Sequence, residues 1–357
     1  MDLAAGLLGV LLLLISLVDI FATVALPRSA RRFRISRYVW RVSWLACRPL
    51  AGRRAISSRR QALLGVFGPL SVFVVLAIWL FLLLIAFGLI VFSLRAQIEP
   101  RPTGLASAIY LAGQALLTLG YVQGPGTSAL ARGVGLIAAA TGLTVFALVI
   151  TFLFSLFAAF REREVEVVTL EASAGAPPSG VAFLEFYASV KMADEIGLAL
   201  QRWQRWAATV LDTHLAYPIL AYFRSAHDND SWISSLGAVM DAATLVLTTI
   251  EGGPVGAAKM ARWVGGHCID DLAVYFGLDR PPYVGIELEE FQEARARLAA
   301  AGYRLKPERE SWEDFKRLRS EHAASLDALA DYWATPPADW IGTEQRTFRH
   351  PPPRRPG

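Results

Sequence analysis

The sequence predicts an all-α membrane protein with three transmembrane helices and a helical cytoplasmic domain. Hydrophobic residues make up 54% of the 357-residue chain, more than a soluble globular domain needs. Three almost uncharged runs, 3–26, 62–94 and 133–160, each exceed the roughly 20 residues that cross a hydrocarbon core as a helix. After Phe160 charged side chains return, and the spacing of the apolar residues is that of further helices.

The distribution of charge predicts the orientation. Residues 1–160 carry 14 basic and 3 acidic side chains, and the rest of the chain carries 21 and 28. Eleven arginines lie between Arg28 and Arg60, a stretch without a carboxylate, and loops rich in arginine stay on the cytoplasmic side. We therefore expect a multi-pass protein of the cell inner membrane, with the N-terminus outside and the C-terminal domain in the cytoplasm.

Residues 1–27 hold the first expected span. Asp2 stands where a signal peptide carries positive charge, and the arginines follow the apolar run, so we expect an uncleaved anchor. Asp19 lies inside this span. Carboxylates in membrane segments pair with neighbouring groups, so we expect Asp19 to make a buried polar contact with an adjacent helix.

Residues 28–61 form the basic loop that follows. Its segment 34–45 interleaves arginine with tyrosine and tryptophan, side chains that favour the lipid headgroup zone. Two interpretations remain open for this segment. It is either a helix that lies on the inner membrane surface or a solvated loop that only sets the orientation.

The stretch between the second and third apolar runs is too short and too rich in glycine to cross a membrane. A short amphipathic helix is predicted over 105–117, and the sequence Thr-Leu-Gly-Tyr-Val follows it. Together with the flanking apolar helices, this order resembles the pore module of the potassium-channel superfamily. The resemblance covers residues 62–160, and it implies two membrane helices around a re-entrant pore helix and filter loop. With the first span added, the expected fold has three transmembrane helices with a re-entrant pore helix and filter loop.

The resemblance also implies a function and its residues. Four subunits would form a pore whose filter carbonyl oxygens replace the water shell of a permeant monovalent cation, potassium in the first place. No other cofactor is implied. Thr118 would offer a hydroxyl and a carbonyl oxygen at the inner end, and Gly120 would permit a backbone conformation that other residues avoid. The filter residues would be Thr118, Leu119, Gly120, Tyr121 and Val122.

Two residues depart from the family pattern. Val122 replaces the second filter glycine, and Gln123 replaces the aspartate that usually follows. A β-branched residue in a left-handed conformation is strained by on the order of 1 to 3 kcal/mol. We therefore expect the outer end of the filter to differ, which leaves open whether the pore selects potassium or has relaxed selectivity. The alternative is a non-conducting membrane sensor or scaffold with a degenerate pore module.

Two features of the third span extend the resemblance. Gly142 follows Gly120 by 22 residues and stands where inner helices of the family have a hinge, although close helix packing explains a membrane glycine equally well. Four phenylalanines lie where inner helices converge in the family. Two of them on one face would form a dewetting gate, and otherwise they would face lipid. They are Phe152, Phe154, Phe157 and Phe160.

The C-terminal half divides into three parts. Residues 161–180 are expected to be a linker with a short extended segment at 165–170, and 336–357 a disordered tail. The helical domain 181–335 lies between them. Ser231 and a capping box at 311–314 would begin two of its helices. The expected helices are 181–214, 218–226, 232–251, 255–277, 286–302 and 312–333.

The apolar segment 232–250 is either a core helix of this domain or a fourth span. We favour a core helix, because charged segments flank it on both sides and a charge inside the membrane is costly. Trp203 and Trp206, three residues apart, are expected to pack in a core, and the alternative is contact with the membrane surface or a partner.

No constellation of residues in the chain predicts an enzyme or a nucleic-acid-binding protein. Two cysteines, Cys47 and Cys268, exclude a disulfide framework and a four-thiolate metal site. His267 and Asp271 share a helix face but are too few for a metal site, so a surface salt bridge or a buried histidine is favoured. The stretch 227–230 lacks the glycine and glutamate of a calcium loop and predicts a turn. No phosphate-binding glycine loop is present, so the ligand or partner of the domain stays open.

Overall fold

The structure is a computed structural model that describes residues 2–24, 35–51, 58–120, 128–225, 231–279, 285–335 and 340–341. In these ranges it is all-helical, and the only β pairing is an isolated bridge between Ile250 and Leu305. The predicted all-α class is therefore confirmed. The chain forms two compact units, which we call the first unit (1–160 and 215–223) and the second unit (161–214 and 224–357).

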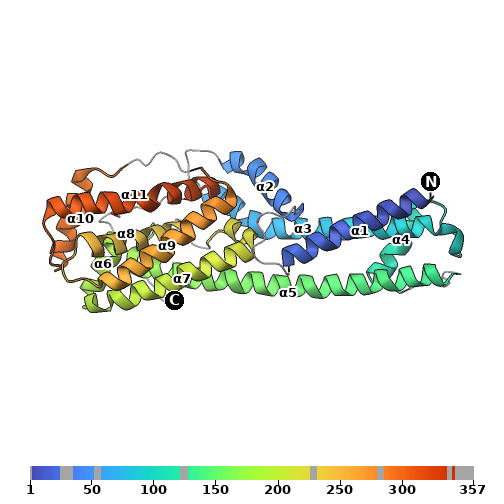
Figure 1. The fold of residues 1–357 in the computed structure, drawn as a ribbon, viewed down its shortest axis with the longest axis horizontal. Coiled ribbons are helices and arrows are strands. Elements are labelled where there is room, and N and C mark those ends of the chain that lie inside the picture. The colour runs from blue at the N-terminus through green and yellow to red at the C-terminus, as the bar shows by residue number, and fades with distance from the viewer. Residues whose placement is uncertain are drawn as a thin grey trace, which may run out of the picture. The chain divides into compact units, whose positions relative to one another are not determined.

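Three helices in the described ranges are long and apolar enough to cross a membrane. They are α1 (Asp2–Val24), α3 (Ser58–Ser93) and α5 (Ala129–Ala174), and they coincide with the three predicted spans. In the first unit α1 and α3 lie side by side over most of the length of α1 (Figure 1). These helices are compatible with a membrane protein.

Helix α5 continues beyond the apolar run, and this corrects two predictions. The expected linker 161–180 is helical up to Ala174, and the expected extended segment 165–170 lies inside the helix. The change at Arg161 is one of polarity and not of backbone, because arginine and glutamate are good helix formers. The helix ends only at Gly175, which takes a left-handed φ of 83°.

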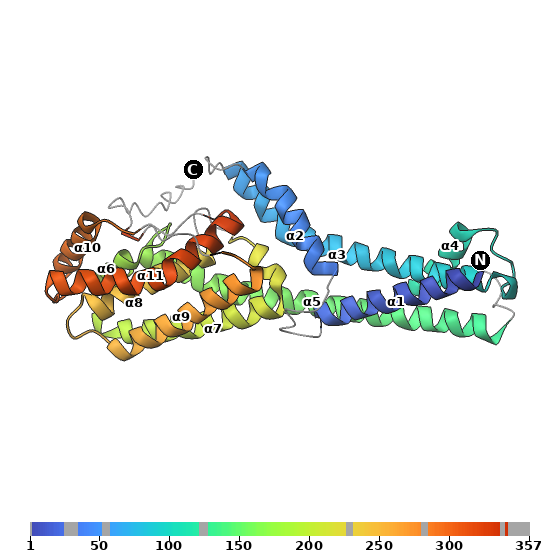
Figure 2. The ribbon, with the colours of Figure 1, turned by 45° about the horizontal axis from the view of Figure 1, so that its top comes forward.

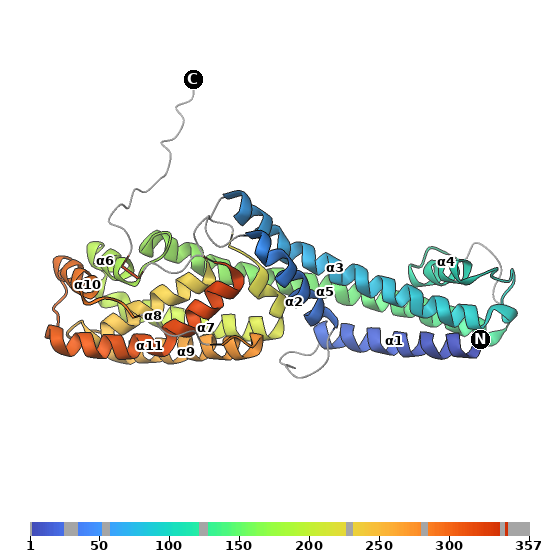
Figure 3. The same ribbon diagram turned by 90° about the horizontal axis from the view of Figure 1, so that it is seen from above.

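The basic loop contains a helix, α2 (Ile35–Cys47), as one of the two interpretations of this segment requires. Trp40 and Trp44 are buried, and the Trp44 ring lies 5.0 Å from that of Phe67 on α3. Figure 3 shows α2 beside the first turns of α3. The tryptophans therefore pack against protein, and Tyr38, Val42 and Leu45 form the exposed apolar side of α2.

Asp19 makes the predicted polar contact with a neighbouring helix. Its carboxylate is buried, and Oδ2 accepts a hydrogen bond from Trp79 Nε1 on α3 at 2.7 Å. Oδ1 accepts one from the backbone N–H of Ile35, the first residue of α2, also at 2.7 Å. One carboxylate thus satisfies a free N–H at a helix start and joins α1, α2 and α3.

We expect Asp19→Asn to lower the stability of the first unit. The amide can accept one of the two hydrogen bonds, but its NH₂ group then faces the other donor, which costs about 1 to 3 kcal/mol when that donor is buried. Thermal unfolding in detergent measures the loss. Asp2→Asn is the control, because this side chain is 45% exposed in its ion pair with Arg95 and should change stability little.

The second unit consists of the end of α5 and six further helices among the described residues: α6 (Gly180–Ser189), α7 (Ile196–Ala216), α8 (Trp232–Thr248), α9 (Val255–Phe276), α10 (Leu288–Ala300) and α11 (Glu308–Trp333). The expected single helix 181–214 is divided, because Lys191 takes a left-handed φ of 60° that ends α6. The expected helix 218–226 is the short 3₁₀ helix η4 (Pro218–Tyr222) within the described range, which ends at residue 225.

The two expected helix caps have different outcomes. Ser231 caps α8, since its hydroxyl accepts a hydrogen bond from the Ser234 N–H at 2.9 Å. The predicted capping box at 311–314 is wrong. Helix α11 already begins at Glu308, and the Ser311 hydroxyl donates to the Pro307 carbonyl at 2.9 Å inside the first turn. Glu308 and Glu310 favour this earlier start, because carboxylates stabilise helix N-termini.

Helix α8 forms the core of the second unit. Every residue of it except Leu247 is buried, and it packs against α6, α9 and α11 (Figure 2). The core interpretation of 232–250 therefore agrees with the structure, and the fourth span does not. Trp203 and Trp206 are also buried, with ring centroids 4.9 Å apart. In the predicted tail 336–357, Trp340 is buried against Phe315, so this residue is ordered, while 336–339 and 342–357 lie outside the described residues.

Candidate pore module

Helix α4 (Leu105–Leu116) occupies the predicted short helix between α3 and α5. It packs along α3 through small buried side chains, Ala108 and Ala112 among them. Small residues let two helix backbones approach closely, which suits an apolar setting where packing and not water drives association. The end of α4 is therefore held in place against α3.

The C-terminus of α4 contains a strained residue, Thr118. Its N–H donates to the Ala115 carbonyl at 3.1 Å, and the Leu119 N–H donates to the Gln114 carbonyl at 3.0 Å. This pair of bonds is a Schellman motif, whose left-handed position usually holds glycine. Thr118 occupies it with a φ of 53°. A β-branched residue there costs on the order of 1 to 3 kcal/mol, and such strain concentrates at functional sites.

The structure places three of the five predicted filter residues together. Thr118, Leu119 and Gly120 follow the helix end directly and are exposed in the single chain, Leu119 by 70%. Gly120 has a φ of 90°, which requires glycine. Tyr121, Val122 and Gln123 lie outside the described residues.

Gly142 lies where α5 meets the last turn of α4. A Cβ added to Gly142 would overlap the carbonyl oxygen of Leu116, two residues before Thr118. Helix α5 runs through Gly142 without a break. This contact matches the close-packing interpretation, and the hinge role stays a prediction. Sequence reasoning singled out the residue, but the partner that it touches appears only in the structure.

Apart from this contact, α5 is the least covered of the three long apolar helices. Only 11% of its most apolar window is buried, compared with 33% for α1 and 39% for α3. Large side chains along α5 are exposed, among them Leu136, Leu143 and Phe146. Lipid or further protein must cover these side chains in a membrane setting.

The four predicted gate residues have different surroundings. Phe152 is buried, with its ring 5.8 Å from that of Tyr217. Phe157 and Phe160 contact the ring of Phe223 at 6.1 and 5.4 Å. Phe154 is 75% exposed. The four side chains therefore do not form one cluster within the chain. Phe154 and, to a lesser extent, Phe157, which is 44% exposed, remain open to a partner or to lipid.

Sequence reasoning missed the segment that holds these phenylalanines. Residues 215–223 lie between α7 and α8 in the chain. Although both helices lie mainly in the second unit, this segment belongs to the first unit. Phe223 is buried, and a Cβ added to Gly68 of α3 would lie 2.7 Å from its ring. Tyr222 packs against Trp44 of α2 at 5.5 Å. The apolar composition of 217–223 was the only sequence signal, and it does not identify these partners.

Adjacent residues at the end of this segment are anchored in different units. Phe223 packs on α3 and α5 of the first unit. Arg224, the next residue, belongs to the second unit and donates to the carbonyl oxygens of Trp333 and Ala334 at 2.8 and 2.9 Å. Its guanidinium caps the C-terminus of α11. The boundary between the two units therefore falls between Phe223 and Arg224.

The second unit holds a fully buried imidazole, His214. Its Nδ1–H donates to the Val210 carbonyl at 2.8 Å, and Nε2 accepts from the Arg163 guanidinium at 3.3 Å. Burial, and then the positive charge of Arg163, hold the pKa of His214 well below its ordinary value of 6.5. His214 is therefore neutral in the folded unit at neutral pH.

We expect acid to destabilise the second unit through His214. The unfolded chain binds this proton near its ordinary pKa and the folded chain only at a lower pH, so stability falls as pH decreases below about 6.5. The loss from one such histidine is at most about 1.4 kcal/mol per pH unit. Unfolding at pH 7.5 and 5.5 measures it. His214→Gln should reduce the difference, because the glutamine amide does not take up a proton in this range. An equal pH dependence in wild type and His214→Gln would contradict this assignment.

The described residues contain no group of three or more side chains that could hold a metal ion. His267 and Asp271 form an exposed pair at 3.4 Å, which agrees with the surface interpretation and not with a buried histidine. Residues 227–230, the stretch considered for calcium, lie outside the described part of the chain. Cys268 is buried, so its thiol is not accessible.

Three comparisons with known proteins return nothing: no family model, no curated protein and no solved structure matches this chain.

Proposed function

We propose that the chain is the subunit of a potassium-channel-like cation channel that conducts ions passively through a homotetrameric pore. The observation that carries the proposal is Thr118, a strained residue at the exposed end of α4 between two long apolar helices. In this proposal α3, α4 and α5 are the outer, pore and inner helices. The N-terminus lies outside, and the second unit is cytoplasmic.

The end of α4 supports cation binding by its chemistry. The C-terminus of a helix carries partial negative charge from its free carbonyl groups and favours a cation nearby. Thr118 adds an exposed hydroxyl at this point. Its left-handed conformation starts a non-helical path for the following carbonyls, as a filter needs. At membrane depth such a path requires protein or water around it, which neighbouring subunits would provide.

The surface of α5 supports assembly. A single pore module provides one quarter of a four-fold filter, so Thr118, Leu119 and Gly120 would face an axis and not lipid. The exposed side chains of α5 would then contact the α5 helices of neighbouring subunits or lipid. Phe154, 75% exposed on the same helix, is the most exposed of the four predicted gate residues and would meet its copies across the axis.

Cation flux tests the proposal directly. The full chain reconstituted in liposomes should conduct potassium or rubidium. The sodium flux is measured in the same vesicles for comparison. The mass in detergent should be that of four chains. Absence of potassium, rubidium and sodium flux at every voltage and pH tested, or a purely monomeric protein, would reject the channel.

We expect Thr118→Gly to separate stability from function. Glycine relieves the left-handed strain, so unfolding should become harder by about 1 kcal/mol, while loss of the hydroxyl at the filter lowers potassium flux. Thr118→Ala is the matched control, because it removes the hydroxyl and keeps a Cβ in the left-handed position. It should lose flux without gaining stability. Wild-type flux in both variants would show that the Thr118 hydroxyl does not take part in conduction.

The alternative is a non-conducting sensor or scaffold with a degenerate pore module. Val122, which stands in place of a filter glycine, favours this alternative. Val122→Gly distinguishes the two. Potassium flux that appears only in the variant indicates a degenerate pore, and flux already present in wild type indicates a working channel.

A further inference from the structure

The second unit contains an open cavity of about 700 Å³ between α8, α9 and α11. Sites for small molecules in proteins have volumes of roughly 300 to 1,000 Å³. Met240 and Leu247 of α8 contribute apolar surface, and the walls carry charged and aromatic side chains from α9 and α11. The cavity lies entirely within the second unit, so it does not depend on the pore module.

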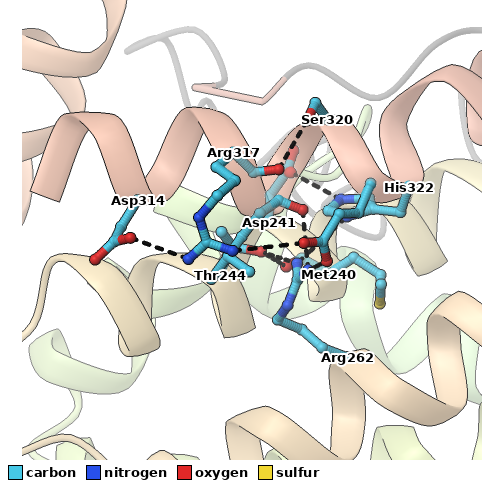
Figure 4. A network of polar contacts seen from close by, with 10 residues as sticks. Met240, Asp241, Thr244, Arg262, Asp314, Arg317, Ser320 and His322 are labelled. Carbon is cyan, nitrogen blue, oxygen red and sulfur yellow. Dashed lines mark hydrogen bonds and ion pairs between the residues drawn. The ribbon is translucent and has the colours of Figure 1, made fainter.

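A network of polar contacts joins the helices that line the cavity, and Arg262 and His322 belong to both the network and the lining (Figure 4). Arg262 of α9 donates to Thr244 Oγ1 of α8 at 2.6 Å and to Glu321 of α11 at 2.9 Å. Asp241 of α8 accepts from Arg319 Nε of α11 at 2.9 Å. These bonds connect the three helices that line the cavity. We therefore expect the cavity to exist before any ligand binds.

The same network shows which charges are already neutralised. Glu321 pairs with Arg262, and Asp314 pairs with Arg317 at 3.0 Å. His322 Nδ1 accepts from Arg262 at 3.3 Å, and burial lowers the pKa of this imidazole, so it adds no positive charge. A ligand has little to gain from these groups.

Two lysine ammonium groups in the cavity have N–H donors available to a ligand. Lys259 of α9 is exposed and forms no ion pair or hydrogen bond with the residues that the structure describes. Lys306 donates to the Leu247 carbonyl at 2.7 Å, which leaves two of its three donors. Both lysines line the cavity. They make it a site for an anionic group.

The wall from α9 adds an aromatic surface. Lys259, Trp263 and His267 are spaced by four residues, so they share one helix face, and all three line the cavity. The Trp263 side chain is 73% exposed. An indole of this exposure contributes nothing to the core, whereas its face is suited to stack against a planar ring.

We infer that this cavity binds a small organic anion that carries a planar aromatic ring. The ring would stack on Trp263, and the anionic group would lie between Lys259 and Lys306. Asp270, which also lines the cavity, would accept a hydrogen bond from an N–H or O–H group on the ring. The inference is independent of ion conduction.

Calorimetry on the full chain in detergent tests the site with defined probes. AMP and indole-3-acetate combine a ring with an anionic group, adenosine has only the ring system, and inorganic phosphate has only the charge. We expect at least one of the two ring-bearing anions to bind with a Kd below about 1 mM, and adenosine and phosphate to bind at least tenfold more weakly.

Variants at exposed positions locate the binding. Trp263→Ala and Lys259→Ala should each raise the Kd of the bound probe at least tenfold. Both side chains are exposed, so neither supports the core. Lys316→Ala is the control, since this exposed lysine of α11 does not line the cavity. Two results would overturn the inference: neither ring-bearing anion binds at millimolar concentration, or binding is unchanged in both variants. Because binding is measured without flux, either result leaves the channel proposal untouched.

Discussion

Gly142→Ala is expected to displace α4 from α5 and to abolish cation flux. The added methyl group would overlap the Leu116 carbonyl oxygen, and a backbone atom at a helix end cannot rotate away as a side chain can. Overpacking usually costs 1 to 3 kcal/mol, and we expect roughly the upper end of this range. In the proposed channel the end of α4 positions Thr118, so even a small shift there moves the filter.

A second glycine of α5 provides the matched control for Gly142. A Cβ added to Gly133 meets no atom within 4 Å, so Gly133→Ala should fold and conduct as wild type. Thermal unfolding in detergent and flux in liposomes measure both variants. If Gly142→Ala unfolds at the wild-type temperature, α4 and α5 are not in contact as described. If it is destabilised but conducts normally, the position of α4 does not control the filter.

Phe223→Ala is expected to produce the largest loss of stability in the first unit. The ring is buried against Phe157 and Phe160 of α5 and against Gly68 of α3. Truncation of a buried phenylalanine to alanine typically costs about 3 to 5 kcal/mol. Two of the predicted gate phenylalanines lose their packing partner, so we also expect the conduction of open channels, or the fraction that is open, to change. Unfolding and single-channel recording measure the two effects.

A substitution at Gly68 tests whether the contact between Phe223 and α3 contributes to the expected loss of stability. Gly68→Ala would place a Cβ 2.7 Å from the Phe223 ring and should destabilise wild type, but it should cost less once Phe223 is already alanine. Gly65→Ala is the control on the same helix, since no atom lies within 4 Å of its added Cβ. Fully additive effects of Gly68→Ala and Phe223→Ala would contradict the contact.

Local signals in the sequence predicted elements well where polarity and backbone change together. Helix α4 agrees with the predicted 105–117 to within one residue, because Gly104 precedes it and a Thr-Leu-Gly sequence follows it. The same signals failed at positions where polarity and backbone conformation do not change together. At Arg161 the polarity changes but the backbone stays helical, and at Lys191 the backbone turns although no glycine or proline marks the place.

Run length, charge and periodicity are properties of neighbouring residues, so they were enough to predict the three long apolar helices and the short helix before Thr118. Only the tertiary structure decided which residues meet. Gly142 touches Leu116, residues 215–223 belong to the first unit, and Lys259 and Lys306 line the same cavity. Each of these contacts joins residues more than twenty positions apart, and close packing between distant segments leaves no periodic trace in the chain.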